Sequence, residues 1–146
     1  MLRFATTALI GSICLAALSA AHAQDAVPRG HWLTQGADAK VRIEPCGAGL
    51  VCGSIAWLKN PIDPETGKRA TDAKNPDPAK RSRPLIGVQL LLGLRPAGPG
   101  RWAGKIYNAD DGQIYNGSIT LLGPGRLKIE GCVFAICGSE IWTKTN

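Results

Sequence analysis

Cysteine is the residue type whose spacing in this sequence most directly suggests chemistry. Four cysteines lie in two close pairs, Cys46 with Cys52 and Cys132 with Cys137. Their thiols could hold zinc, but intervals of five and four residues are wider than those of the usual zinc knuckles. A redox couple would need C-x-x-C and a helix N-terminus. Disulfides are the expected chemistry, because an even number of cysteines in a small exported domain typically forms them.

An internal repeat predicts which cysteines pair. Residues 41–46 and 127–132 share the order apolar, basic, Ile, Glu, turn-former, Cys, and both copies continue after a short gap as C-G-S-x-x-W-x-K. Each copy is typical of a β-hairpin whose cysteines lie near the turn. Cysteines that face each other across antiparallel strands come close enough to bond. We therefore predict the pairs Cys46–Cys52 and Cys132–Cys137.

A long polar loop, residues 60–84, carries a second group of candidates. It is rich in Pro, Asp, Asn, Lys and Arg, and a loop of this length often acts as a lid or a binding loop. Arg81 and Arg83 could clamp a carboxylate or a phosphate. Alternatively, Arg83 and the aspartates pair with each other and with backbone groups to order the loop over one barrel mouth. The loop-ordering residues are then Asp63, Asp72, Asn75 and Asp77. The acidic spacing does not match a known calcium loop, so no metal or cofactor is predicted.

The large aromatic residues are candidates for lining a ligand pocket. A barrel with an open mouth can hold a ring or an acyl chain against such side chains. The candidates are Trp32, Trp57, Trp102, Tyr107 and Tyr115, with Trp142 as a further large aromatic. The alternative for each of them is that it fills the core or plugs a barrel end.

Support for catalysis is thin. His31 is the only histidine outside the N-terminal segment, and no Ser or Cys motif accompanies it. Glu44 and Glu130 could form an acid pair, but their equivalent outward positions in the repeat are typical of solvated surface. We therefore predict no catalytic residue and favour a protein that is not an enzyme.

The N-terminus predicts export. Arg3 precedes an uncharged apolar run, and residues 21–23 have the A-x-A spacing of a signal-peptidase site. The apolar run is shorter than the roughly 20 residues that span a bilayer. We predict a signal peptide at residues 1–23, cleaved after Ala23, and a single periplasmic domain at residues 24–146 with no membrane span.

The charge of the chain is mildly basic and selects no partner. Seventeen basic and 11 acidic residues give a net charge of +6. This balance favours acidic surfaces without identifying one. The basic residues are scattered apart from Lys80, Arg81 and Arg83, and an exported protein rarely meets nucleic acid, so no nucleic-acid partner is expected.

The elements that must position these residues are short strands separated by turns. No segment shows a helical period, and alternating apolar residues with Gly, Pro and Asn-Asp turns predict eight strands. They are expected at residues 30–34, 41–46, 52–59, 86–94, 101–107, 113–122, 126–131 and 138–144. Short connections between sequential strands favour an all-β, up-and-down barrel, because closure removes the sheet edges.

Several dense motifs occur in order along the chain. They are G-x-W, V-R-I-E-P-C-G, C-G-S-I-A-W-L, D-P-E-T-G-K, D-A-K-N-P-D-P, R-S-R-P-L-I-G, R-W-A-G-K-I-Y-N and D-G-Q-I-Y. This pattern resembles the bacterial exported family known as domain of unknown function 2147, over nearly the whole chain after residue 23. The resemblance implies a lipocalin-like barrel in the cell envelope and no agreed activity.

Two functions follow as expectations. The first is a periplasmic binding module that holds a small apolar or amphipathic ligand, with the polar loop over the mouth of the barrel. The alternative is a non-enzymatic interaction or structural protein of the envelope that acts through its basic loop. An open barrel interior would favour the first function, and a filled interior would favour the second.

Overall fold

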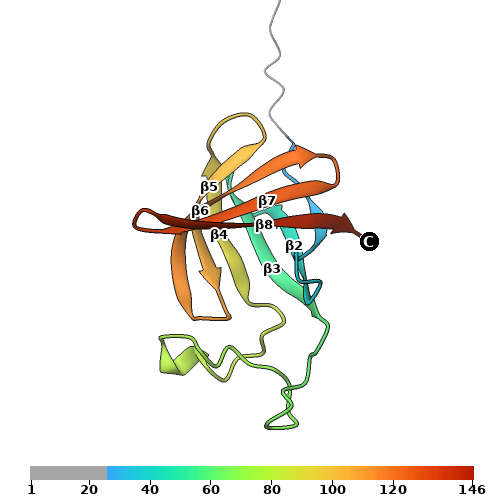
Figure 1. Ribbon diagram of the computed structural model, residues 1–146, viewed down its shortest axis with the longest axis vertical. Coiled ribbons are helices and arrows are strands. Elements are labelled where there is room, and N and C mark those ends of the chain that lie inside the picture. The colour runs from blue at the N-terminus through green and yellow to red at the C-terminus, as the bar shows by residue number, and fades with distance from the viewer. Residues whose placement is uncertain (1–25) are drawn as a thin grey trace, which may run out of the picture.

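Eight antiparallel strands close into a barrel, as the sequence predicts. The computed structural model describes residues 26–146 (Figure 1). The strands are β1 Gly30–Leu33, β2 Ala39–Pro45, β3 Val51–Leu58, β4 Gln89–Pro96, β5 Arg101–Asn108, β6 Gln113–Gly123, β7 Arg126–Val133 and β8 Ile136–Thr145. Each strand pairs with its neighbours in the chain, and β8 pairs with β1 to complete the sheet. The prediction of an all-β, up-and-down barrel is confirmed.

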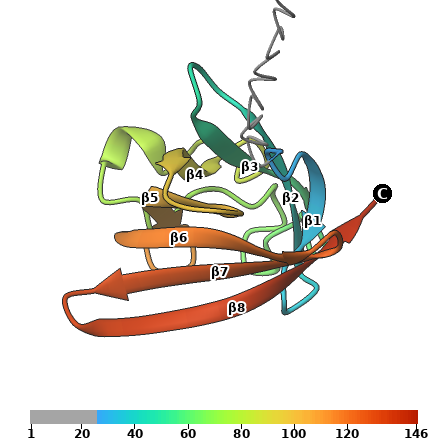
Figure 2. The ribbon, with the colours of Figure 1, turned by 90° about the horizontal axis from the view of Figure 1, so that it is seen from above.

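The connections alternate between the two ends of the barrel. Those after β1, β3, β5 and β7 lie at one end, which we call the cavity end, and those after β2, β4 and β6 lie at the other, which we call the packed end. In Figure 1 the β3–β4 loop hangs below the barrel and the β4–β5 turn lies at its top. Figure 2 shows the β7–β8 hairpin projecting beyond the other strands. The two cysteine hairpins therefore point to opposite ends.

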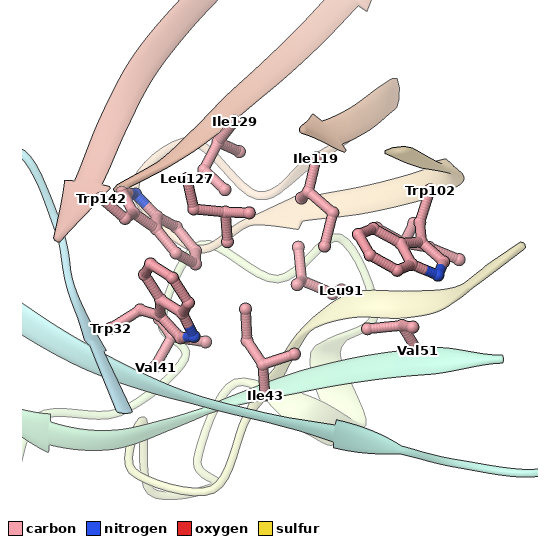
Figure 3. Close-up of a cluster of buried hydrophobic side chains, with 11 residues drawn as sticks. Trp32, Val41, Ile43, Val51, Leu91, Trp102, Ile119, Leu127, Ile129 and Trp142 are labelled. Carbon is pink, nitrogen blue, oxygen red and sulfur yellow. The ribbon is translucent and has the colours of Figure 1, made fainter. Parts of the chain in front are cut away.

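Inward-facing side chains form a continuous core toward the packed end. On β2, Val41 and Ile43 are fully buried while Arg42 and Glu44 are exposed, as alternation along a strand requires. Figure 3 shows these inward residues meeting side chains from the opposite wall of the barrel. The buried cluster comprises Trp32, Val41, Ile43, Val51, Leu91, Leu94, Trp102, Ile119, Leu127, Ile129 and Trp142. This half of the interior is filled.

Both predicted disulfides are present. Cys132 lies directly opposite Cys137, and their Cα atoms are 4.1 Å apart. In the first hairpin Cys52 instead lies opposite Glu44, so Cys46 reaches it diagonally over a Cα distance of 5.7 Å. The face-to-face arrangement expected from the sequence therefore holds for the second hairpin only.

The strand predicted at residues 86–94 is displaced. It begins at Gln89 and ends at Pro96, two residues into the segment expected to break it. Gly87 has a φ of +99°, so the chain bends before the strand begins. Pro96 is tolerated because it is the last residue of the strand, opposite Trp102.

The second cysteine hairpin is longer than expected. Val133 and Ile136 form a further pair beyond the disulfide, and the chain reverses over Phe134 and Ala135. The strands were expected to end at Gly131 and to resume at Gly138, but they remain paired through the disulfide to Val133 and Ile136.

The polar loop predicted at residues 60–84 lies between β3 and β4. It contains one short 3₁₀-helix, η1 Pro78–Lys80, which Asp77 caps by accepting from the backbone N–H of Ala79. Isolated bridges join Ile62 to Arg69 and Thr71 to Pro84, so the loop folds back on itself. None of the helices in residues 26–146 has the length and apolar character needed to cross a membrane. The predicted signal peptide lies outside the described residues.

Candidate functional site: a cavity at one end of the barrel

A cavity of about 980 Å³ opens at the cavity end. Residues of β2 to β8 form its wall together with the β1–β2, β3–β4, β5–β6 and β7–β8 connections. The apolar part of the wall comprises Ile55, Leu58, Leu85, Leu90, Ile106, Ile129, Val133, Phe134 and Ile136. Three further aromatic side chains, Tyr107, Tyr115 and Trp142, complete it. A volume of this size matches ligand pockets, which run to about 1,000 Å³.

The change from filled to hollow interior can be followed along β7 and β8. Toward the packed end, the inward pair is Leu127 opposite Trp142, two large side chains. Four residues along β7, the inward pair is Gly131 opposite Gly138, and both line the cavity. An ideal Cβ at Gly131 would lie 3.3 Å from Cβ of Tyr115 on the neighbouring strand, whereas one at Gly138 would meet no atom within 4 Å, so the unfilled space lies at Gly138.

The charged residues of the wall are all acidic. Asp38 comes from the β1–β2 loop, Asp110 from the β5–β6 turn and Glu140 from β8. The hydroxyl of Thr34 donates to Asp38 at 2.5 Å, and the indole N–H of Trp142 donates to Glu140. As far as residues 26–146 form it, the wall contains Asp and Glu but no Lys, Arg or His, although the whole chain has a net charge of +6.

A buried carboxylate ties the long loop to the barrel beside the cavity. Asp72 is fully buried and accepts hydrogen bonds from the Tyr107 hydroxyl at 2.6 Å, from Asn75 Nδ2 at 2.8 Å and from Arg83 Nε at 2.9 Å. A second guanidinium nitrogen of Arg83 forms an ion pair with it at 2.7 Å. Three side chains thus donate hydrogen bonds to one carboxylate, and this network links the loop to β5.

These contacts shift two pKa values in opposite directions. Burial alone would raise the pKa of Asp72, but hydrogen bonds from Tyr107, Asn75 and Arg83, with the Arg83 charge, hold it below its usual range. Burial, together with the hydrogen bond to Asp72 and its charge, raises the pKa of Tyr107 to about 12. The phenol therefore stays protonated at neutral pH and donates to a carboxylate that stays ionised.

The predicted loop residues have different surroundings. Asp72, Asn75 and Arg83 meet in the network just described. Arg81 instead donates to the backbone carbonyl of Asn75 at 2.8 Å, and Asp63 accepts from the backbone N–H of Glu65 at 2.8 Å. Asp77 caps the 3₁₀-helix. Neither arginine lines the cavity.

The predicted aromatic residues divide into two groups. Tyr107 and Tyr115 line the cavity. Trp32 and Trp102 lie in the filled core (Figure 3), and Trp57 lies outside the cavity wall with the Lys40 ammonium 5.6 Å from its ring centre. This placement agrees with the core-filling alternative for the two buried tryptophans.

Sequence reasoning missed the acidic residues of the wall and the apolar hairpin tip. Alternation from the buried Trp142 back along β8 places Glu140, Gly138 and Ile136 on the inner face, so Glu140 and Ile136 carried a readable signal. Asp38 and Asp110 lie in turns, where side-chain direction does not follow from strand alternation. They could not have been identified from spacing alone.

A second hollow of about 580 Å³ lies where the long loop leaves β3. It is lined by Leu58, Pro61, Ile62, Arg69, Ala70, Pro84 and Ile86. Ile62 and Ile86 are half exposed, so this hollow is a surface depression within the loop rather than part of the barrel interior.

Comparison with known proteins identifies a family and a fold. A family model described as "Uncharacterized protein conserved in bacteria (DUF2147)" matches residues 30–144. Among solved structures, the chain is similar to protein HP1028 from Helicobacter pylori, which is described as belonging to the lipocalin family. The TM-score is 0.66 at 22% sequence identity, covering 81% of this chain and 82% of that one. No curated protein matches the sequence. The lipocalin-like fold is thus shared.

Proposed function

This chain belongs to the bacterial family DUF2147, and we propose that it is a binding protein that holds a small apolar or amphipathic ligand in its barrel cavity. The observation that carries this proposal is the division of one barrel into a filled half and a hollow half. Side chains can fill a barrel interior of this size, as they do in the packed half. Leaving the other half open to solvent loses packing energy. A bound ligand would supply the missing contacts.

The surroundings of the cavity suit an apolar body. Ile55 and Tyr107 are buried, with Leu58, Leu85 and Leu90 packed beside them. At the mouth, Phe134 is 99% exposed and Ile136 is 81% exposed, and both belong to the wall. Apolar surface therefore continues from the interior to the rim. Exposed apolar side chains at the edge of a pocket are typical of ligand entry and of ligand contact.

We place this binding function outside the cytoplasm. The two disulfides are compatible with an exported protein, because such bonds persist in oxidising compartments. The proposal of a periplasmic location rests further on the signal-peptide pattern of residues 1–23.

An interaction role through the long loop is the second candidate. Residues 60–84 carry six basic and four acidic side chains. However, Arg81 and Arg83 already donate to groups within the loop, which lowers their availability for a partner. Recovery of the same crosslinked envelope partner by the intact protein, and its loss after Lys68 and Lys80 are replaced by Ser, would support this role.

A cavity-blocking pair of variants tests the binding function. An ideal Cβ at Gly138 would meet no atom within 4 Å, and the same holds for Gly125 in the β6–β7 turn at the packed end. Gly138→Trp should fill the cavity, whereas Gly125→Trp adds the same side chain elsewhere. The wild type and each variant are purified from the periplasm of the native bacterium. Native mass spectrometry should then show a small-molecule adduct on the wild type and on Gly125→Trp only. Equal adducts on both variants would contradict a cavity site.

A further inference from the structure

Building on the binding function proposed above, we infer that the cavity selects ligands with a cationic polar end, an amine or a quaternary ammonium carried on an apolar body. The starting observation is the single sign of charge in the wall. Asp38, Asp110 and Glu140 line the cavity, whereas none of the Lys, Arg and His residues among residues 26–146 does. In a chain with a net positive charge, this segregation produces a local negative potential at the mouth.

Within the described part of the chain, the protein pairs none of the three carboxylates with a cation. None of the ion pairs within residues 26–146 includes Asp38, Asp110 or Glu140. Lys74 contacts this region, but its ammonium donates to the backbone carbonyl of Asp110 at 2.8 Å rather than to its carboxylate. The carboxylates therefore keep their capacity to attract a ligand cation.

The donors of the wall point to the same ligand class, because the protein itself already uses most of them. The hydroxyl of Tyr107 donates to Asp72, and that of Tyr115 donates to Asp111. The Thr34 hydroxyl and the Trp142 indole donate to wall carboxylates. The remaining side-chain donors of the wall are those of Asn60, Asn108 and Ser139. A carboxylate or phosphate ligand would meet few donors and three like charges, which disfavours it.

The aromatic side chains fit an organic cation better than a metal ion. Within residues 26–146, no group of three or more His, Cys, Asp or Glu side chains could hold a metal. The three carboxylates come from separate elements around the mouth. Tyr107, Tyr115 and Trp142 line the same wall. Aromatic faces attract ammonium groups that have lost part of their hydration, and nearby carboxylates strengthen that attraction.

A series of ligands with one chain length tests this selectivity. Dodecyltrimethylammonium, dodecanol and dodecanoate share the apolar body and differ in charge. Each is titrated below its micelle concentration against the intact protein carrying N-phenyl-1-naphthylamine, and displacement of this neutral dye is followed by fluorescence. We expect affinity to fall from cation to alcohol to anion, with about a tenfold difference between the two ions at low salt. The difference should narrow in about 0.5 M salt, which screens exposed charges.

Two double variants with the same change in net charge locate the effect. Asp110→Asn with Glu140→Gln removes two wall carboxylates, and Glu44→Gln with Glu65→Gln removes two carboxylates that lie outside the wall. The ratio of cation to anion affinity should fall to near one in the first variant and stay within about twofold of the wild type in the second. Thermal melts establish that both variants are folded.

The outcomes separate this inference from the binding function on which it rests. Equal affinities for the three ligands, or tighter binding of dodecanoate, would overturn the cation selectivity and leave the binding function standing. The same conclusion would follow if both double variants lost the preference equally. Failure of the dye and of all three ligands to bind the wild type would overturn the binding function itself.

Discussion

The two cysteine hairpins share a sequence motif but have different surroundings. In both, the second cysteine begins the sequence C-G-S, so Gly53 and Gly138 are equivalent. An ideal Cβ at Gly53 would lie 2.8 Å from Cδ1 of Leu91, whereas one at Gly138 would meet nothing within 4 Å. The same motif is thus filled by a neighbouring leucine at the packed end and left open at the cavity end. The difference shows that the cavity depends on the side chains that face the hairpin, and not on the sequence of the hairpin itself.

The largest expected effect comes from emptying the packed half. Leu91→Ala removes a fully buried side chain that several strands surround and should lower the free energy of unfolding by about 2–5 kcal/mol. Ile136 lies in the hollow half, and its side chain is 81% exposed. Ile136→Ala should therefore change the free energy of unfolding by less than about 0.5 kcal/mol. Urea denaturation measures both. Similar losses in the two variants would contradict the division of the interior.

The equivalent glycines should respond differently to the same substitution. Gly53→Ala forces a methyl group into Leu91 and Val41, where an ideal Cβ comes within 2.8 Å and 3.2 Å of side-chain atoms. This overpacking should lower the free energy of unfolding by about 1–3 kcal/mol. Gly138→Ala should leave the free energy of unfolding within about 0.5 kcal/mol of the wild-type value, because the added methyl group enters open space. Thermal denaturation of the two variants side by side measures the difference in stability. Equal stability of Gly53→Ala and Gly138→Ala would contradict the different surroundings of the two glycines.

A smaller effect is expected for the network that ties the long loop beside the cavity. Tyr107→Phe removes one hydrogen bond to the buried Asp72 and should lower the free energy of unfolding by about 1–2 kcal/mol at neutral pH. The network has no counterpart at the packed end, where the connections are short turns. Comparison of urea midpoints with the wild type gives the loss.

The pH dependence of the same variant has a defined sign. The pKa of Asp72 in the folded state lies below its usual value of 3.8, so its contribution is fully present above pH 3.8 and is lost as pH falls through the lower value. The pKa of Tyr107 is raised from 10.0 to about 12, so its contribution is lost as pH rises through that interval. Tyr107→Phe should flatten both limbs of the stability profile. Unchanged limbs would show that the pair does not titrate as described.

The sequence predicted the closed barrel, the disulfide pairs and the polar loop because each depends on local patterns. Alternation gives the inner face of a strand, and repeated hairpin motifs give the cysteine partners. The cavity could not be predicted because it depends on contacts between distant strands. The space at Gly53 is filled by Leu91, which lies 38 positions later in the sequence. No pattern near Gly53 predicts this contact. For the same reason Trp102 could not be assigned to the core rather than to the pocket.

The most direct test of the cavity as a binding site uses the tryptophan indole N–H signals in a nuclear magnetic resonance titration with dodecanol. Trp142 lines the cavity, whereas Trp32 and Trp102 are core residues outside its wall, and the Trp32 indole donates to the backbone carbonyl of Pro28 at 2.8 Å. The account predicts saturable shifts of the Trp142 indole and the Gly138 amide, with the Trp32 and Trp102 indoles unmoved. Saturable shifts at Trp32 or Trp102 with Trp142 unmoved, or no saturable shift at all, would contradict it.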